Sequence, residues 1–135
     1  MAKTFTIEIV TPEKKVYTGT IEGVVAVGTE GSFGVLHGHA PFISELQAGI
    51  LEITEENKKK VRFGLDGGFF EIIGNNAVVL TDTCVTKKEV DLEKVRGEKN
   101  AAEEALKREG TVSEKERAQA AIKRADVWIK LASEK

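Results

Sequence analysis

The chain has 135 residues, of which 41% are hydrophobic and 31% charged, a composition typical of one or two small globular domains. Its formal net charge of −2 argues against a nucleic-acid-binding protein, and no apolar run approaches the roughly 18 residues that cross a bilayer. The N-terminal ten residues show no apolar core followed by a small-residue cleavage site, so no signal peptide is expected. The single cysteine, Cys84, allows neither an internal disulfide nor a zinc quartet, and we expect it to be a small apolar strand residue.

Composition changes sharply near residue 87. Residues 1–86 contain 11 of the 13 glycines, both prolines and seven of the eight aromatic residues, whereas residues 87–135 are a dense mixture of Ala, Glu, Lys and Arg. The first part carries 7 basic and 11 acidic side chains, a net charge of −4, and the second carries 13 and 11, a net charge of +2. We therefore expect two domains, residues 1–86 and 87–135.

The first domain contains short apolar stretches that alternate with polar residues and are bounded by turn formers. In TFTIEIV, the side chains of Phe5, Ile7 and Ile9 fall on one face of a strand. The stretches GVVAV, GILEIT, KVRFGL, FFEII and AVVLT follow at intervals of roughly ten residues, which predicts an antiparallel β-sandwich. The sequence GNN at 74–76 fits a tight hairpin with positive φ, and the lysine run at 58–60 fits a solvated hairpin end.

The second domain has the period of a helix. A first helix is expected to begin at Glu89 or Asp91 and to end at Gly110, and its apolar face comprises Leu92, Val95, Ala102, Ala105 and Leu106. Ser113 and Glu116 form a capping-box pattern for a second helix, whose face comprises Ala118, Ala121, Ile122, Ala125, Ile129 and Ala132. Residues 88–133 are thus predicted to be an antiparallel helical hairpin, held together weakly because each alanine buries little apolar surface.

The stretch GTEGSFGVLHGHAPF, residues 28–42, concentrates four glycines with both histidines of the chain. The spacing of His37 and His39 could place two imidazoles on one face of a strand for a metal ion. The glycine between them and the proline that follows instead predict a bent loop, and no nearby Cys, Asp or Glu cluster completes a metal site. We therefore expect no metal, and interpret the stretch as a loop with hydrogen-bonded or interface histidines.

The sequence LDGGFFEI places Phe69 and Phe70 next to each other in a predicted strand, so their side chains point to opposite faces. One of them is then expected to lie outside the core and to mark a docking surface. The alternative, in which both rings are covered within the domain, stays open.

No motif indicates an active site. The chain has no G-x-S-x-G, no G-x-x-x-x-G-K-[ST], no H-E-x-x-H and no cysteine pair. The residues therefore favour a structural or binding protein over an enzyme.

Four segments in this order resemble one family: VTPEKKVYTG, EGSFGVLHGHAPFISEL, LDGGFFEI and NNAVVLTD, followed by the alanine-rich hairpin. Together they resemble the epsilon subunit of the F-type ATP synthase of bacteria and chloroplasts, over essentially the whole chain. The resemblance implies a non-catalytic subunit of the central rotor, peripheral to the cytoplasmic face of the inner membrane, whose sandwich contacts the gamma subunit and the c-ring. Candidate contacts are Glu30, Ser32, His37, His39, Phe69 and Phe70. His37 stands where the family commonly has proline, and Ser32 where an acidic residue is frequent.

The resemblance also implies that the hairpin is a regulatory arm. In this family it folds against the sandwich, or extends along gamma toward the alpha and beta subunits and inhibits ATP hydrolysis. Arg117, Lys123 and Arg124 are the candidates for contact with beta; the alternative is a solvated face of paired charges.

Some relatives bind ATP as a regulatory ligand in the folded hairpin, through a pattern like [IL]-D-x-x-R-A. The corresponding stretch is VDLEKVRG, which matches in two incomplete registers. One gives Asp91 with Lys94 in the arginine position, and the other gives Arg96. Arg124 is retained on the second helix, whereas Trp128 stands where a further arginine is expected. A free β-sandwich with a nucleotide-sensing hairpin therefore remains an alternative function.

Overall fold

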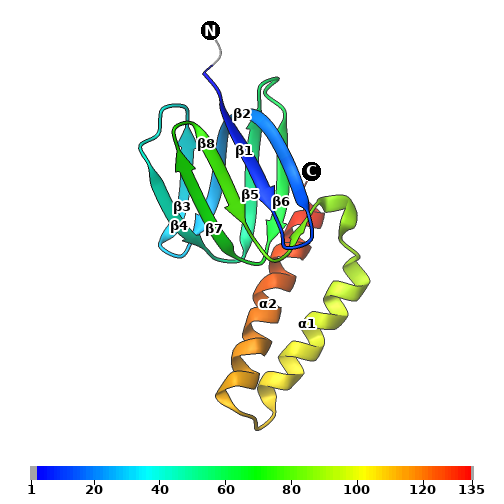
Figure 1. The fold of residues 1–135 in the computed structure, drawn as a ribbon. Helices are drawn as coiled ribbons and strands as arrows, with labels where there is room; N and C mark the ends of the chain where they lie inside the picture. The colour runs from blue at the N-terminus through cyan, green and yellow to red at the C-terminus, as the bar shows by residue number, and fades with distance from the viewer. Residues whose placement is uncertain (1–2, 135) are drawn as a thin grey trace.

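The structure, a computed structural model, describes residues 3–134 and consists of a β-sandwich followed by a helical hairpin, as the sequence predicted (Figure 1). The strands are β1 (Phe5–Val10), β2 (Lys15–Gly28), β3 (Gly31–Leu36), β4 (Phe42–Leu46), β5 (Gly49–Glu55), β6 (Lys60–Leu65), β7 (Gly68–Ile73), β8 (Asn76–Leu80) and β9 (Cys84–Val85). A 3₁₀ turn, η1 (Lys87–Glu89), leads into helices α1 (Leu92–Lys107) and α2 (Val112–Ser133). Within residues 3–134 no helix is both long and apolar enough to cross a membrane.

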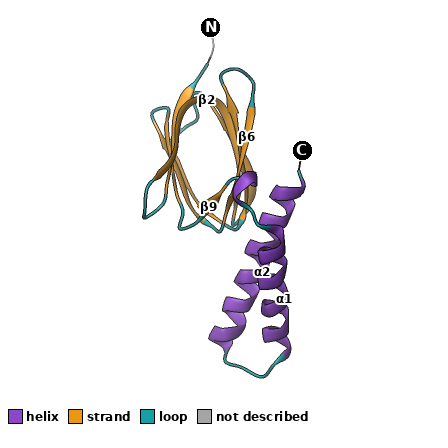
Figure 2. Ribbon diagram, turned by 90° about the vertical axis from the view of Figure 1, so that its right-hand side faces the viewer, coloured by secondary structure: helices purple, strands orange, loops and turns teal. Residues whose placement is uncertain are grey.

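Figure 2 shows the two layers of the sandwich edge on, with the helices beside the layer that contains β6. One layer joins β1, β8, β7 and β4, and the other joins β3, β2, β5, β6 and β9. The pairing of β1 with β8 is parallel, an exception to the otherwise antiparallel sheet. The 14-residue β2 belongs to both layers, because its first half pairs with β1 and its second half with β3 and β5.

A bulge in β2 lets the strand turn from one layer into the other. The register against β5 shifts between Ile21 and Gly23, and the buried side chains change from Ile21 to the even-numbered Val24 and Ala26. An extra residue in one strand bends it and increases its twist. The bulge therefore keeps β2 facing the core on both sides of the corner.

The core lies between the two layers and comes from the alternating strand residues. Phe5, Ile7 and Ile9 are all buried, as their spacing predicted, and Phe70 meets Phe33 edge to face with ring centroids 5.3 Å apart. A second, smaller cluster of Val95, Ala125 and Trp128 lies in the hairpin. The two clusters are separate cores.

The predicted turn at 74–76 is confirmed. Ile73 pairs with Asn76 across a two-residue loop, and both Gly74 and Asn75 have positive φ, at 57° and 62°. This is the backbone that a tight hairpin with right-handed strand twist requires.

The interpretation of residues 28–42 as one loop is wrong. Residues 31–36 form β3, which pairs with β2 along its whole length and has a turn at each end. The glycine content concealed this strand, because glycine is depleted in strands. Gly31, the first residue of β3, and Gly38, in the turn after the strand, have positive φ values of 123° and 78°.

The predicted start of the second helix is wrong by two residues. The Thr111 side chain is the N-cap and accepts a hydrogen bond from the Glu114 N–H over 3.1 Å, so Ser113 lies inside the first turn. The two capping patterns overlap, and the upstream one adds two residues to the helix. In α1, Asp91 is the N-cap as predicted, but Ala105, which was predicted to lie on the apolar face, is exposed.

Candidate partner-binding face and hairpin

The layer of β1, β8, β7 and β4 presents apolar side chains to its outer side. Side chains in a strand alternate between faces, so the partners of the buried core residues point outward. Phe69 is 51% exposed and Leu80 52% exposed, and they belong to β7 and β8, whereas the hairpin packs on β5 and β6 of the other layer. We call this surface the outer apolar face; its members are Val10, Ile43, Phe69, Ile73, Val78 and Leu80.

Strand register brings three members of the outer apolar face side by side. Phe69 lies opposite Leu80 on β8, and Leu80 lies opposite Val10 on β1. Carboxylates interrupt the face, because Glu45 lies opposite Phe69 and Glu71 lies opposite Ile43. The surface therefore combines exposed apolar side chains with negative charge, an arrangement typical of a protein-binding surface.

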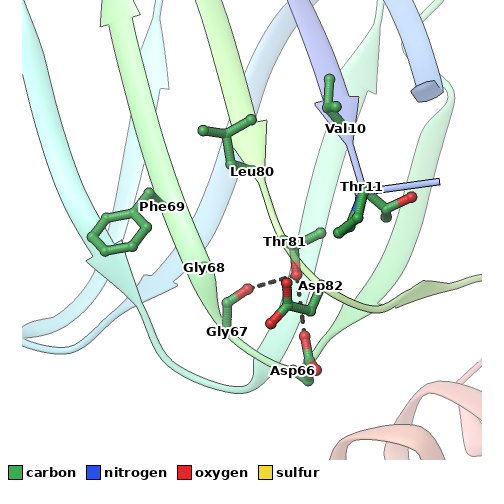
Figure 3. A pocket seen from close by; sticks show the side chains of 10 residues that line it. Val10, Thr11, Asp66, Gly67, Gly68, Phe69, Leu80, Thr81 and Asp82 are labelled. Atoms are coloured by element: carbon green, nitrogen blue, oxygen red, sulfur yellow. Dashed lines mark hydrogen bonds between the residues drawn. The ribbon is translucent and has the colours of Figure 1, made fainter. Parts of the chain in front are cut away.

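A hollow of about 400 Å³ lies at one end of this face, between the β6–β7 turn and the end of β8 (Figure 3). Hydrogen bonds fix the wall of this hollow. The buried Thr81 hydroxyl donates to the Gly67 carbonyl oxygen over 2.7 Å, and Asp66 Oδ1 accepts from the Thr83 N–H over 3.1 Å. Gly68 has a φ of 130°, and a Cβ there would overlap the backbone carbonyl of Leu80. The absence of a side chain at Gly68 thus allows the start of β7 to lie close to the backbone at the end of β8.

The two phenylalanines lie on opposite faces, as predicted. Phe69 belongs to the outer apolar face, whereas Phe70 is 0% exposed in the core. The prediction that Phe70 contacts a partner is therefore wrong, because its ring is covered by Phe33 and Phe42 of the same domain.

The other predicted contacts lie at opposite ends of the sandwich. Glu30 occupies the turn between β2 and β3, and Ser32 follows it on β3, where both are exposed. The Thr29 N–H donates to the Glu45 carbonyl oxygen, which holds this turn at the end of β4. That end also carries the β6–β7 turn, next to the hairpin.

His37 and His39 lie beyond the other end of β3. The Gly38 N–H donates to Asn75 Oδ1 over 2.9 Å, which ties this turn to the β7–β8 turn. The His39 ring meets Phe42 edge to face, with centroids 5.5 Å apart. Among the described residues, no group of three or more His, Cys, Asp and Glu side chains could hold a metal ion.

The hairpin is held by a narrow apolar contact and by ion pairs. Ala102 of α1 and Ala118 and Ala125 of α2 are buried. Lys99 Nζ lies 2.7 Å from Asp126 Oδ1, and this hydrogen bond raises the pKa of Lys99. These three alanines lie on the faces that the sequence predicted for the contact between the helices.

The three basic residues proposed for the inhibitory contact differ in their surroundings. Arg117 and Lys123 are exposed, whereas Arg124 is half-buried with its guanidinium 3.9 Å from Glu98 Oε2 on α1. Arg117 and Arg124 also flank a hollow that Asp66 of the sandwich lines. In this arrangement Arg124 therefore faces a carboxylate of the chain itself, whereas Arg117 remains exposed.

Only part of the predicted nucleotide set converges. Lys94 and Arg124 line one cavity of about 190 Å³ between the helices, together with Trp128 and Glu98. The Asp91 side chain caps α1 by accepting from the Lys94 N–H. Arg96 is exposed and does not line this cavity, so the structure favours the register that contains Lys94.

Cys84 is a half-buried residue of β9, as its apolar role predicted. Burial raises the pKa of its thiol to about 12, and the nearby carboxylates of Glu89 and Asp66 add to the shift. Burial and a 2.7 Å hydrogen bond to Glu55 also raise the pKa of Tyr17. Both groups are therefore protonated at neutral pH.

The sequence analysis missed two sets of buried or exposed apolar residues. Ile43, Ile73 and Leu80 were not singled out, although strand parity places them on the same side as Phe69. Leu131 was also missed; it is buried at the C-terminal end of α2, close to Gly64 of the sandwich. Trp128, three residues earlier, packs in the hairpin with Val95 and Ala125.

A sandwich with one exposed apolar outer face and a helical hairpin packed on its other layer defines a two-domain protein with a surface suited to binding another protein. Family models match both parts: the beta-sandwich domain of the ATP synthase delta/epsilon chain over residues 4–87, and its long alpha-helix domain over residues 88–133. The chain belongs to the ATP synthase epsilon family.

Full-length relatives support this assignment. The ATP synthase epsilon chain of Desulforamulus reducens is 37% identical over 132 residues, covering 98% of this chain and 99% of that protein. The epsilon chain of Leptospira interrogans is 41% identical over 97 residues, covering 72% and 74%.

Solved structures share the fold. A chain of the Euglena gracilis mitochondrial ATP synthase, OSCP/F1/c-ring, superposes with a TM-score of 0.85 at 20% identity, covering 98% of this chain and 82% of that one. A chain of the central stalk and c-ring of the Tetrahymena thermophila enzyme gives 0.69 at 18%, covering 95% and 96%.

Proposed function

We propose that this chain couples rotation of the membrane c-ring to the catalytic head of ATP synthase, as a subunit of the central rotor. The outer apolar face carries this proposal. Exposed side chains such as Phe69, Leu80 and Ile43 need a protein partner to cover them, and we assign that partner as the gamma subunit. The chain would thereby be peripheral to the cytoplasmic face of the inner membrane.

The two ends of β3 suggest two different partners. Glu30 and Ser32 lie at one end of the sandwich, and His37 and His39 lie beyond the other end. One flat surface cannot cover both ends. We therefore assign Glu30 and Ser32 to the polar loops of the c-ring, and His37 and His39 to gamma.

The hairpin is proposed to inhibit ATP hydrolysis when it extends toward the alpha and beta subunits. Arg117 and Lys123 are exposed on α2 and free to meet acidic segments of beta. Because alanines make up much of the buried contact between α1 and α2, separating the two helices should cost less free energy than separating a contact of larger apolar side chains.

The first experiment compares the ATP hydrolysis rate of an alpha, beta and gamma head assembled with the full chain and with residues 1–86. The sandwich has its own core, so the truncated chain is expected to bind. A higher rate with residues 1–86 supports the inhibitory arm. Equal rates with both chains bound limit the role to coupling, and failure of both to bind contradicts the proposed function.

A double substitution distinguishes the effect of positive charge on α2 from the effect of deleting the whole hairpin. Arg117→Ala with Lys123→Ala should raise the hydrolysis rate in the full chain, because it removes positive charge from α2. Lys107→Ala with Arg108→Ala removes the same charge at the end of α1 and should leave the rate unchanged. An equal effect of both pairs would contradict a specific contact through α2.

Regulatory ATP binding is a second candidate function, favoured by the convergence of Lys94 and Arg124 on one cavity. Both cations could approach phosphate oxygens, although lysine lacks the planar fork of arginine. Glu98 lines the same cavity and opposes an anion, so binding requires the pair of Glu98 and Arg124 to separate.

A further inference from the structure

The hollow at the end of the outer apolar face combines apolar walls with an acidic edge. Its apolar lining comes from Val10, Pro12, Phe69 and Leu80. Two aspartates, Asp66 and Asp82, also line it, and none of the described residues around it is basic. Figure 3 shows the two aspartates together at one edge, with Leu80 and Val10 at the opposite edge. We call this cavity of about 400 Å³ the end hollow.

The two aspartates differ in what they already bind. Asp66 Oδ1 accepts from the Thr83 N–H over 3.1 Å, so part of this carboxylate is used inside the domain. Asp82 is exposed, and within residues 3–134 its carboxylate has neither a hydrogen bond nor an ion pair. The Asp82 carboxylate is therefore the group in the end hollow that is available to a ligand.

The end hollow is formed before any partner binds. Gly67 and Gly68, which line it, have φ of 131° and 130°, a backbone conformation that other residues rarely adopt. The Thr81 hydroxyl is only 5% exposed as a residue and joins the end of β8 to Gly67. A cavity held in this way loses little conformational entropy when it is filled, which favours binding.

The charges on the surrounding face select the sign of the partner. Glu45 and Glu71 point outward among the apolar side chains, and neither carboxylate has an ion-pair partner among the described residues. Glu8 of β1 is the exception, because Lys15 Nζ lies 3.4 Å from its Oε1. The face is thus apolar and acidic, and it is complementary to a surface that is apolar and basic.

We propose that the end hollow binds one long basic side chain, arginine or lysine, of the gamma subunit. The aliphatic stem of such a side chain packs against Phe69 and Leu80, and its cationic head pairs with Asp82. The inference rests on the proposed function, because gamma is the partner assigned to the outer apolar face. The end hollow shares Val10, Phe69 and Leu80 with that face.

The apolar surroundings make this ion pair stronger than an ordinary surface pair. An exposed pair contributes little, because water screens both charges. Once gamma covers Phe69 and Leu80, water is excluded from the end hollow and the pair is desolvated. Side chains that fill such pockets at the centre of an interface contribute most of the binding energy.

The test titrates purified gamma with the full chain carrying Asp82→Asn. Two control variants remove the same charge elsewhere: Glu71→Gln on the outer apolar face but outside the end hollow, and Glu56→Gln in the exposed turn between β5 and β6. We expect Asp82→Asn to weaken binding about tenfold or more, and each control to change it by less than about twofold. Hydrogen exchange at Ile72, in the core, reports whether each variant is folded.

Unchanged affinity in Asp82→Asn would overturn the inference. An equal loss in Glu71→Gln would also overturn it, because the attraction would then be a property of the whole face and not of the end hollow.

Charge reversal provides a second test and identifies the occupant. Asp82→Lys should reduce binding further than Asp82→Asn does, because it places two like charges in the end hollow. Each exposed arginine and lysine of gamma is then replaced in turn by glutamate. Restored binding to Asp82→Lys by one of these gamma variants supports the inference and names the side chain, whereas restoration by none of them overturns it.

The same titrations distinguish this inference from the proposed function. If gamma binds the unsubstituted chain and Phe69→Ala weakens binding while Asp82→Asn does not, the end hollow is not an anchor and the proposed function stands. If gamma does not bind the unsubstituted chain, both are contradicted.

Discussion

Two neighbouring phenylalanines of β7 allow the stability of the sandwich to be separated from partner binding. Phe70 is fully buried, so Phe70→Ala should lower the free energy of unfolding by about 3–5 kcal/mol. Phe69 is 51% exposed and has about half as much surface to return to water, so Phe69→Ala should cost about 1 kcal/mol. Denaturant titration of the two variants measures this difference.

Affinity for gamma should show the opposite order: Phe69→Ala should weaken binding more than Phe70→Ala does. If Phe69 is a central contact on the outer apolar face, Phe69→Ala should weaken binding by about 2 kcal/mol, or roughly 30-fold in Kd. Titration of purified gamma with each variant, under conditions where all are folded, gives this value. Leu36→Ala is the control, because Leu36 is 68% exposed but lies on the other layer.

Two results would refute this reasoning. Unchanged affinity for gamma in Phe69→Ala would show that the outer apolar face is not the docking surface. An equal loss of unfolding free energy in both variants would show that the two rings are not on opposite sides of the layer.

Three further predictions test the helices, the thiol and the nucleotide. Thr111→Ala should lower the exchange protection of the first turn of α2 by about 1 kcal/mol, whereas Ser113→Ala should not, and the reverse order would contradict the observed cap. Because the folded pKa of Cys84 is raised from 9.0 to about 12, the unfolded thiol ionises first, so stability should fall as pH rises through this window. Urea titrations at several pH values should show that the free energy of unfolding falls less with pH in Cys84→Ala than in the unsubstituted chain. The same pH dependence in both proteins would argue against burial of the thiol. If the hairpin binds ATP, millimolar ATP should raise the melting temperature of the full chain but not of Lys94→Ala or Arg124→Ala; no shift in the full chain would exclude this site.

Strand periodicity predicted the core wherever the side chains themselves carried the pattern. Phe5, Ile7 and Ile9 alternate with polar residues, and all three are buried. The pattern failed at β3, where two of the six residues are glycines and only Phe33 and Val35 show the alternation on the core side. A strand that depends on pairing with a neighbour, here β2, is not visible in its own residues.

The candidate site was predicted only in part, because it depends on which strands and helices pack together in the folded chain. Parity placed Phe69 and Phe70 on opposite faces, but only the layer order shows which face is covered. Gly64 gave no signal in the sequence, since its importance lies in Trp128, which is 64 residues away along the chain. Long-range contacts of this kind follow from topology and not from local propensity.

The path of β2 has a mechanical consequence for the sandwich. Two sheets that meet only through side chains can slide past each other, whereas here one covalent strand is hydrogen-bonded into both layers. A shearing force applied to β7 and β8 reaches β5 and β6 through backbone hydrogen bonds and the chain itself. The sandwich should therefore respond to force as one stiff body, and most elastic deformation should occur in the hairpin and in the connection at residues 86–91.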